Sequence, residues 1–261
     1  MREGHPVVWL GTVCAVTTVA VGTTNLIGLA WLVACLASAG LLAAGPRRAS
    51  FTVALGAALL TALWWTIATV ALPTGAGPTL LSIPRWEPGP GVHFGGDLTL
   101  GAATNGLTRA LSATAILLVL GLAGQMVGAR SWLALTRLLG PLAPAAAPLA
   151  CLGEACCEAT AASSAARRRG LAARRFAPTR FLTAVAQLSR WQPSSAQNRL
   201  PRPRVGDLLH LAAPVALAAV LTLSGPLGLT STLSSTDLLP TVPWPLIGAA
   251  TLIPLGVVRR A

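Results

Sequence analysis

Long apolar runs separated by short arginine-rich segments constrain the fold of this chain more than any other feature. A transmembrane helix needs about 20 mostly apolar residues, because the hydrocarbon core of a bilayer is about 30 Å thick. Only 10% of the residues are charged and the mean hydropathy is +0.68, whereas soluble domains carry about 25% charged residues. The pattern predicts an all-α, polytopic membrane bundle of about six spans, at residues 7–21, 26–44, 51–72, 108–127, 206–223 and 243–258.

The positions of the basic residues predict how this bundle is oriented. All 19 basic residues are arginine, and the net charge is +12. With a cytoplasmic N-terminus, every arginine except Arg85 and Arg109 falls on the cytoplasmic side, where membrane proteins carry an excess of basic residues. We therefore expect a multi-pass protein of the bacterial inner (plasma) membrane with both termini in the cytoplasm. Because the charge is confined to short segments between apolar runs, it indicates topology rather than nucleic-acid binding.

The apolar runs divide the chain into three parts. We expect an N-terminal transmembrane bundle over residues 1–129, a cytoplasmic arginine-rich segment over 130–205 and C-terminal transmembrane helices over 206–261. Within the first part, residues 73–101 are rich in proline and glycine. That composition excludes a regular helix and predicts a structured outer loop.

A further apolar stretch, residues 138–162, differs from the six spans because it carries Glu154 and Glu158. A carboxylate costs about 2.5–3.5 kcal/mol at the centre of a membrane helix. We therefore expect a helix that lies on the cytoplasmic surface or packs against the bundle and that continues to Arg169. A second short helix is expected over residues 179–191, after Pro178.

The end of that cytoplasmic helix concentrates positive charge in Arg167, Arg168 and Arg169, followed by Gly170. One interpretation is that the cluster sets the topology and contacts anionic membrane lipid, each arginine contributing about 1 kcal/mol near the surface. The other interpretation is that the guanidinium groups form bidentate hydrogen bonds to carboxylates in a partner protein. The surrounding alanines would let the helix approach a groove in that partner closely.

These residues resemble a known family. The Ala-Arg-x-Arg-Gly-like stretch ending at Gly170 is similar to the coupling helix of the transmembrane T component of energy-coupling-factor (ECF) transporters. The upstream His93-Phe94-Gly95-Gly96 stretch and the later Arg109 resemble a pattern of actinobacterial members, so the likeness covers about residues 94–207.

The resemblance implies a transmembrane scaffold subunit of an importer for a vitamin or a transition metal such as cobalt. Its arginines would lie in grooves of two ATP-binding cassette ATPase subunits, and it would pass their motion to a substrate-binding membrane protein. Arg167 and Arg169 would insert into the grooves, beside Arg168, and Gly170 would allow the close approach. Arg174 and Arg175 would belong to a second, degenerate copy of the motif that lacks its glycine.

Other interpretations stay open beside this one. His93 and Asp97 in the outer loop could line an entrance site for a metal or a substrate, although a structured extracellular cap is favoured. A soft metal could be bound by a second set of residues, which are Cys151, Glu154, Cys156, Cys157 and Glu158. Small packing residues are favoured at the cysteines, because their spacing is not Cys-x2-Cys.

The alternative functions are a membrane-embedded enzyme or an orphan scaffold that uses the arginine cluster to bind anionic lipid or a phosphorylated substrate. An enzyme needs convergent carboxylates or a nucleophile–base pair, and the chain has only 7 acidic residues. We therefore expect no catalytic residue, no cofactor and no metal site, while the transported substrate stays open.

Overall fold

The computed structural model describes residues 5–43, 47–89, 92–136, 143–169, 178–189 and 244–258. Over these residues the chain is mostly helical, which confirms the expected fold class at that level, and it also contains one two-stranded sheet. The elements are α1 (Pro6–Gly22), α2 (Leu26–Leu42), α3 (Arg48–Ala71), β1 (Thr79–Gly89), β2 (Val92–Thr99), α4 (Leu100–Met126), α5 (Ala129–Thr136), α6 (Ala143–Arg168), α7 (Pro178–Ser189) and α9 (Trp244–Val258).

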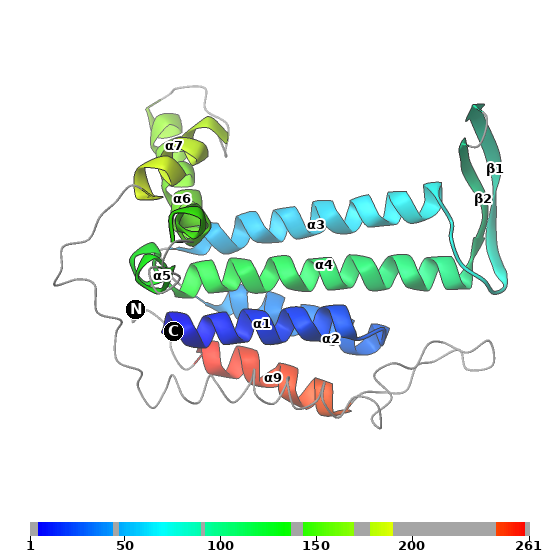
Figure 1. Ribbon diagram of the computed structural model, residues 1–261, viewed down its shortest axis with the longest axis horizontal. Coiled ribbons are helices and arrows are strands. Elements are labelled where there is room, and N and C mark those ends of the chain that lie inside the picture. The colour runs from blue at the N-terminus through cyan, green and yellow to red at the C-terminus, as the bar shows by residue number, and fades with distance from the viewer. Residues whose placement is uncertain are drawn as a thin grey trace.

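The helices α1, α2, α3, α4 and α9 lie side by side along the long axis of the molecule (Figure 1). The β1–β2 hairpin lies at one end of this bundle, here called the hairpin end. Helices α5, α6 and α7 lie at the opposite end, together with the start of α3. We call it the arginine end, because the described arginines other than Arg85 and Arg109 belong to these elements or lie directly next to one of them in the chain.

Two of the described helices, α3 and α4, are long and apolar enough to cross a membrane. Their 24 and 27 residues correspond to about 36 and 40 Å at 1.5 Å per residue. Helices α1 and α2 are apolar but have 17 residues each, and α9 has 15. The expected span at residues 206–223 lies outside the described residues.

The span expected at residues 108–127 begins earlier than its apolar run, because α4 starts at Leu100. Thr99 provides the reason: its side-chain oxygen accepts a hydrogen bond from the backbone N–H of Ala102 at 3.2 Å, which caps the helix. Asn25 caps α2 in the same way, accepting from the N–H of Gly28 at 3.0 Å. In both helices, one polar side chain directly before the first helical residue thus sets the start.

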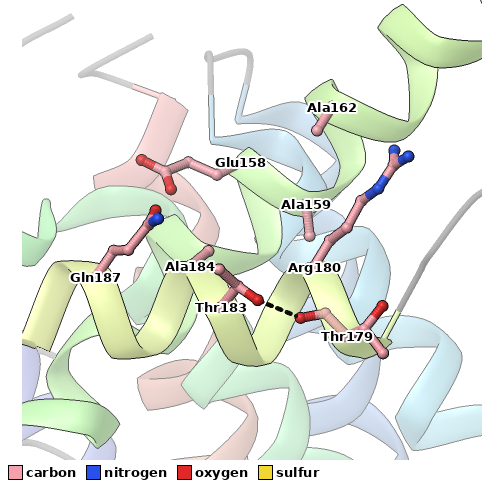
Figure 2. Close-up of a pocket in the computed structure, with 8 residues that line it drawn as sticks. All are labelled: Glu158, Ala159, Ala162, Thr179, Arg180, Thr183, Ala184 and Gln187. Atoms are coloured by element: carbon pink, nitrogen blue, oxygen red, sulfur yellow. Dashed lines mark hydrogen bonds between the residues drawn. The ribbon is translucent and has the colours of Figure 1, made fainter.

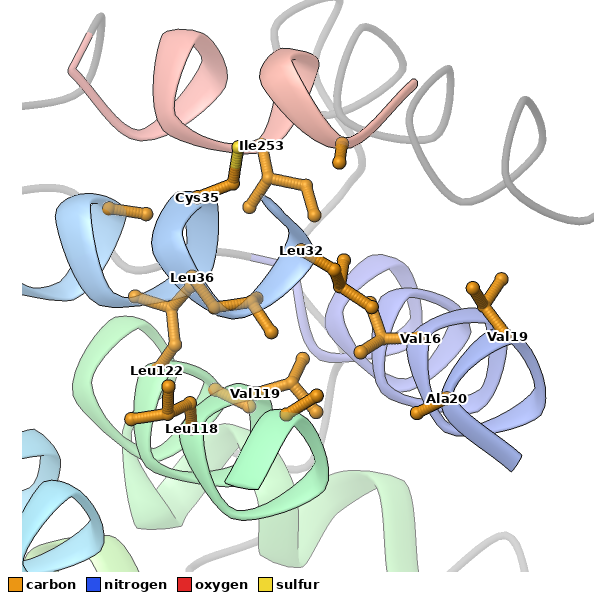
Figure 3. Packing of buried hydrophobic residues seen from close by; sticks show 14 of the residues in the cluster. Val16, Val19, Ala20, Leu32, Cys35, Leu36, Leu118, Val119, Leu122 and Ile253 are labelled. Atoms are coloured by element: carbon orange, nitrogen blue, oxygen red, sulfur yellow. The ribbon is translucent and has the colours of Figure 1, made fainter. Parts of the chain in front are cut away.

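The core is formed where α1, α2, α4 and α9 meet. Figure 3 shows Val16 of α1, Leu32 and Leu36 of α2, and Leu118 and Leu122 of α4 directed toward one another, and each is at most 1% exposed. The helix α9 covers α2 with its own buried apolar residues, which are Leu246, Ala249, Ala250 and Ile253.

The outer segment at residues 73–101, predicted as a structured loop without a helix, contains a β-hairpin that the sequence did not specify. Strands β1 and β2 pair antiparallel, with Ser82 opposite Asp97 and Trp86 opposite Phe94. The Ser82 hydroxyl donates to Asp97 Oδ1 at 2.8 Å, so Asp97 has a role in the hairpin. The exclusion of a helix was correct, but proline did not prevent pairing, because a strand in a two-stranded ribbon has a free edge. The His93 side chain lies outside what the structure describes.

Candidate coupling surface

Helix α6 connects the arginine cluster to the long helices of the bundle. One side of it is lined by small buried residues at helical spacing, which are Cys151, Ala155, Ala159, Ser163 and Ala166. The absence of large side chains along this stripe lets α6 pack closely, and it contacts α3, α4, α5 and α7.

The closest approach between α6 and α4 occurs at two glycines. A Cβ atom added to Gly153 would lie 2.9 Å from both the Cα and the carbonyl oxygen of Gly124. A Cβ added to Gly124 would lie 2.6 Å from the Ser50 hydroxyl of α3. The backbones of α6 and α4 are therefore in direct contact, and a side chain of α3 fills the remaining space.

Glu154 holds α6 against the short helix α5. Its Oε2 accepts a hydrogen bond of 2.8 Å from the backbone N–H of Ala129. Ala129 is the first residue of α5. A carboxylate at a helix N-terminus satisfies an otherwise unpaired donor and interacts favourably with the helix dipole. This role explains why an acidic residue is placed in an apolar stretch.

The arginine tip, defined as Arg167, Arg168 and Arg169, is exposed at the C-terminal end of α6. The N–H of Arg169 is shared between the carbonyl oxygens of Ala165 and Ala166, at 3.2 and 3.1 Å, so the helix tightens as it ends. Positive charge at a helix C-terminus is stabilised by the helix dipole. The predicted Gly170, Arg174 and Arg175 lie outside the described residues.

Among the described residues, no carboxylate pairs with the arginine tip. Glu154 is engaged with α5. Glu158 lies nine residues before Arg167 on the same helix, which corresponds to about 13 Å along the axis. Three guanidinium groups with exposed side chains and no described acidic partner form a surface that is complementary to an anionic one.

A groove of about 280 Å³ runs between α6 and α7. Figure 2 shows Glu158 and Arg180 near opposite ends of the groove, with Thr183 between them. The Thr183 hydroxyl donates to the Thr179 carbonyl at 2.9 Å. The groove thus presents one charge of each sign, and it adds a recessed surface to the arginine end.

The cysteines of α6 contribute to packing. Cys151 and Cys156 are 0% and 9% exposed. Burial raises the pKa of each thiol to about 11, and nearby Glu154 and Glu158 add to the effect at Cys151. Both thiols are therefore protonated at neutral pH and are poor nucleophiles or metal ligands. In the part of the chain that the structure describes, no three His, Cys, Asp or Glu side chains lie close enough to hold a metal ion.

The structure adds features to this region that the sequence interpretation did not contain. Helix α5, the contact between Glu154 and Ala129 and the contact between Gly124 and Gly153 were not predicted. The glycines gave a usable signal, because small residues are enriched where membrane helices approach closely. The second short helix, expected at residues 179–191, is observed as α7 over Pro178–Ser189.

Comparison of the chain with family models, with curated protein sequences and with solved structures gives no match in any of the three. The function is therefore inferred from the chemistry and geometry of the described residues, together with the motifs of the sequence.

Proposed function

We propose that the protein is a multi-pass scaffold of the bacterial inner membrane, with about six spans and both termini in the cytoplasm. In this proposal it is the coupling subunit of an ECF-type importer and performs no catalysis. The observation that carries the proposal is an exposed arginine tip at the end of α6, a helix whose backbone contacts that of the long helix α4 at Gly153. A surface built only to attract lipid would not require that contact.

The geometry supports transmission of motion along α6. Arg168 lies 15 residues after Gly153, which corresponds to about 22 Å of helix. Because protein interiors are close-packed and poorly compressible, a displacement of the tip is passed to the helices that touch its base. These are α4, which meets Gly153 at Gly124, and α3.

The chemistry of the tip supports an acidic protein partner. A guanidinium group binds a carboxylate through two parallel hydrogen bonds, whereas a lysine ammonium offers only a point charge. Two ATP-binding cassette ATPase subunits would supply the carboxylates, and the bundle would pass their motion to a substrate-binding membrane protein. The cargo, a vitamin, a transition-metal ion or another small solute, would be selected by that protein.

The second candidate is an orphan scaffold or membrane enzyme whose arginine tip binds anionic lipid or a phosphorylated substrate. The same exposed charge favours it, since an arginine cluster at a membrane surface attracts anionic headgroups. It differs from the coupling proposal in one measurable respect, namely that no ATPase would accompany the purified protein.

The test is purification of the tagged full-length protein in mild detergent, with mass-spectrometric identification of the chains that accompany it. We expect two ATPase chains with the wild type. Removing one charged bidentate contact in Arg169→Ala should lower their recovery about tenfold, since hydrogen bonds to charged groups contribute about 1.5–3 kcal/mol. Arg169→Lys should also impair recovery.

The matched control is Arg48→Ala, which removes one exposed arginine from the same end of the bundle but outside the tip. It should recover the ATPase chains as the wild type does. Full recovery with Arg169→Ala would refute the coupling role of the tip. Purification of the wild type with bound anionic lipid and without ATPase would favour the second candidate.

A further inference from the structure

A second recessed site lies near the hairpin end, between α3 and α4. It is a pocket of about 250 Å³, and its polar lining comes from Thr69 and Thr74 and from Asn105 and Arg109 of α4, beside the ring of Trp65. No carboxylate lines it. The pocket therefore offers positive charge and polar groups without an acidic residue to neutralise them.

Arg109 is held at this pocket by an aromatic ring. Its guanidinium carbon lies 5.5 Å from the centroid of the Trp65 ring, which is a cation–π contact. That contact covers one face of the planar group and leaves its N–H donors at the edges. Thr69 packs against Gly106, one turn away, where a side chain would collide with it. Glycine at this position thus lets α3 and α4 approach closely beside the arginine.

The depth of Arg109 can be worked out from the length of α4. If Met126, four residues before Arg130, marks the cytoplasmic edge of the hydrocarbon core, about 30 Å of core corresponds to about 20 residues. The opposite edge then falls near Leu107. Side chains on a helix tilt toward its N-terminus, so the guanidinium group of Arg109 is directed to the hairpin-side boundary. This is the level of lipid phosphates.

We propose that the Arg109 pocket binds a phosphate group at the outer boundary of the membrane. The guanidinium edge would donate two hydrogen bonds to phosphate oxygens, and the Asn105 amide would add a further donor. An ionisable residue on a membrane span costs free energy and commonly marks a functional site. The phosphate belongs either to the headgroup of a phospholipid or to a free anion in the external water.

This inference depends on membrane insertion of α3 and α4, and not on the ATPase contact of the arginine tip. The two sites lie at opposite ends of the bundle, so Arg109→Gln should leave ATPase recovery unchanged. Failure of one proposal is therefore distinguishable from failure of the other.

The experiment is native mass spectrometry of the full-length protein in detergent, titrated with phosphatidylglycerol and separately with phosphatidylcholine. Because cytoplasmic arginines also attract anionic lipid, the measured quantity is the difference between variants. The wild type should retain one more tightly held phosphatidylglycerol than Arg109→Gln, and its affinity for that lipid should be about tenfold higher. Asn105→Ala, which keeps the charge, should weaken the same event several-fold.

Arg85→Gln is the matched control, since Arg85 lies at the same end on β1, exposed and outside the pocket. It should bind as the wild type does. Displacement of the extra lipid by inorganic phosphate would assign the site to a free anion, and retention would assign it to a lipid headgroup. Equal binding of both phosphatidylglycerol and inorganic phosphate by the wild type and Arg109→Gln would overturn the proposal, as would an equal loss in Arg85→Gln.

Discussion

The contact between Gly153 and Gly124 provides the sharpest test of how α6 is attached to the bundle. In Gly153→Ala, the added methyl carbon would lie 2.9 Å from the Cα and the carbonyl oxygen of Gly124. Ordinary contacts between carbon atoms are about 3.5–4.0 Å. Both neighbouring atoms belong to the backbone and cannot rotate away, so α6 must move away from α4 by about half an ångström or more.

The magnitude follows from two opposing effects. Overpacking of this kind costs about 1–3 kcal/mol, whereas alanine in place of glycine within a helix gains about 0.5–1 kcal/mol. Gly56→Ala isolates the second effect, because nothing lies within 4 Å of a Cβ atom added at Gly56 of α3. The difference in unfolding free energy between the two variants should therefore equal the overpacking cost, about 1–3 kcal/mol.

The assay is thermal unfolding of the purified variants in the same detergent. For a chain of this size, 1 kcal/mol corresponds to a shift in Tm of about 2–4 °C. We expect Gly56→Ala to melt at or above the wild-type temperature and Gly153→Ala to melt several degrees below Gly56→Ala. Equal or higher Tm for Gly153→Ala would show that α6 does not contact α4 through its backbone, and the proposed transmission of motion would lose its basis.

Two further predictions concern α6. Glu154→Ala should lower the unfolding free energy by about 0.5–2 kcal/mol, because the N–H of Ala129 loses its acceptor. Glu154→Gln, which keeps an acceptor oxygen, should lose less of the unfolding free energy. Hydrogen exchange of the backbone N–H groups at the start of α5 would report the effect of each variant. Equal protection in the wild type and both variants would contradict the cap. Burial raises the pKa of Cys151 and Cys156 from 9.0 to about 11, so between these values the folded state holds more protons than the unfolded state. The free energy of unfolding should therefore fall as pH rises from 9 toward 11. The double variant Cys151→Ala/Cys156→Ala should show a smaller fall. A series of melting curves at increasing pH would test this.

Several elements were predictable because the signals that define them are local. The apolar run at residues 26–44 appears as α2 over Leu26–Leu42, and its start is set by the adjacent Asn25. The helix leading to the arginine tip was expected from alanine content and from the two acidic residues that disfavour membrane insertion. Its observed form, α6, ends at Arg168, one residue before the predicted end at Arg169.

The hairpin was missed for the opposite reason. Proline and glycine in residues 73–101 correctly excluded a helix, but strand pairing depends on which residues of the two strands face each other, such as Ser82 and Asp97. The register is supported by Trp86 and Phe94, whose ring centroids lie 5.7 Å apart. Composition alone does not specify such a register.

The sequence by itself determined the helical class, most of the long helices and the placement of most of the described arginines at one end, because hydrophobic length and charge act over short stretches of chain. The tertiary structure decided which residues meet. Glu154 reaches Ala129, Gly153 meets Gly124 and Arg109 lies over Trp65, each across two different helices. These contacts depend on how helices cross, and a crossing is fixed by side-chain packing between distant segments, which the order of residues within either segment does not reveal.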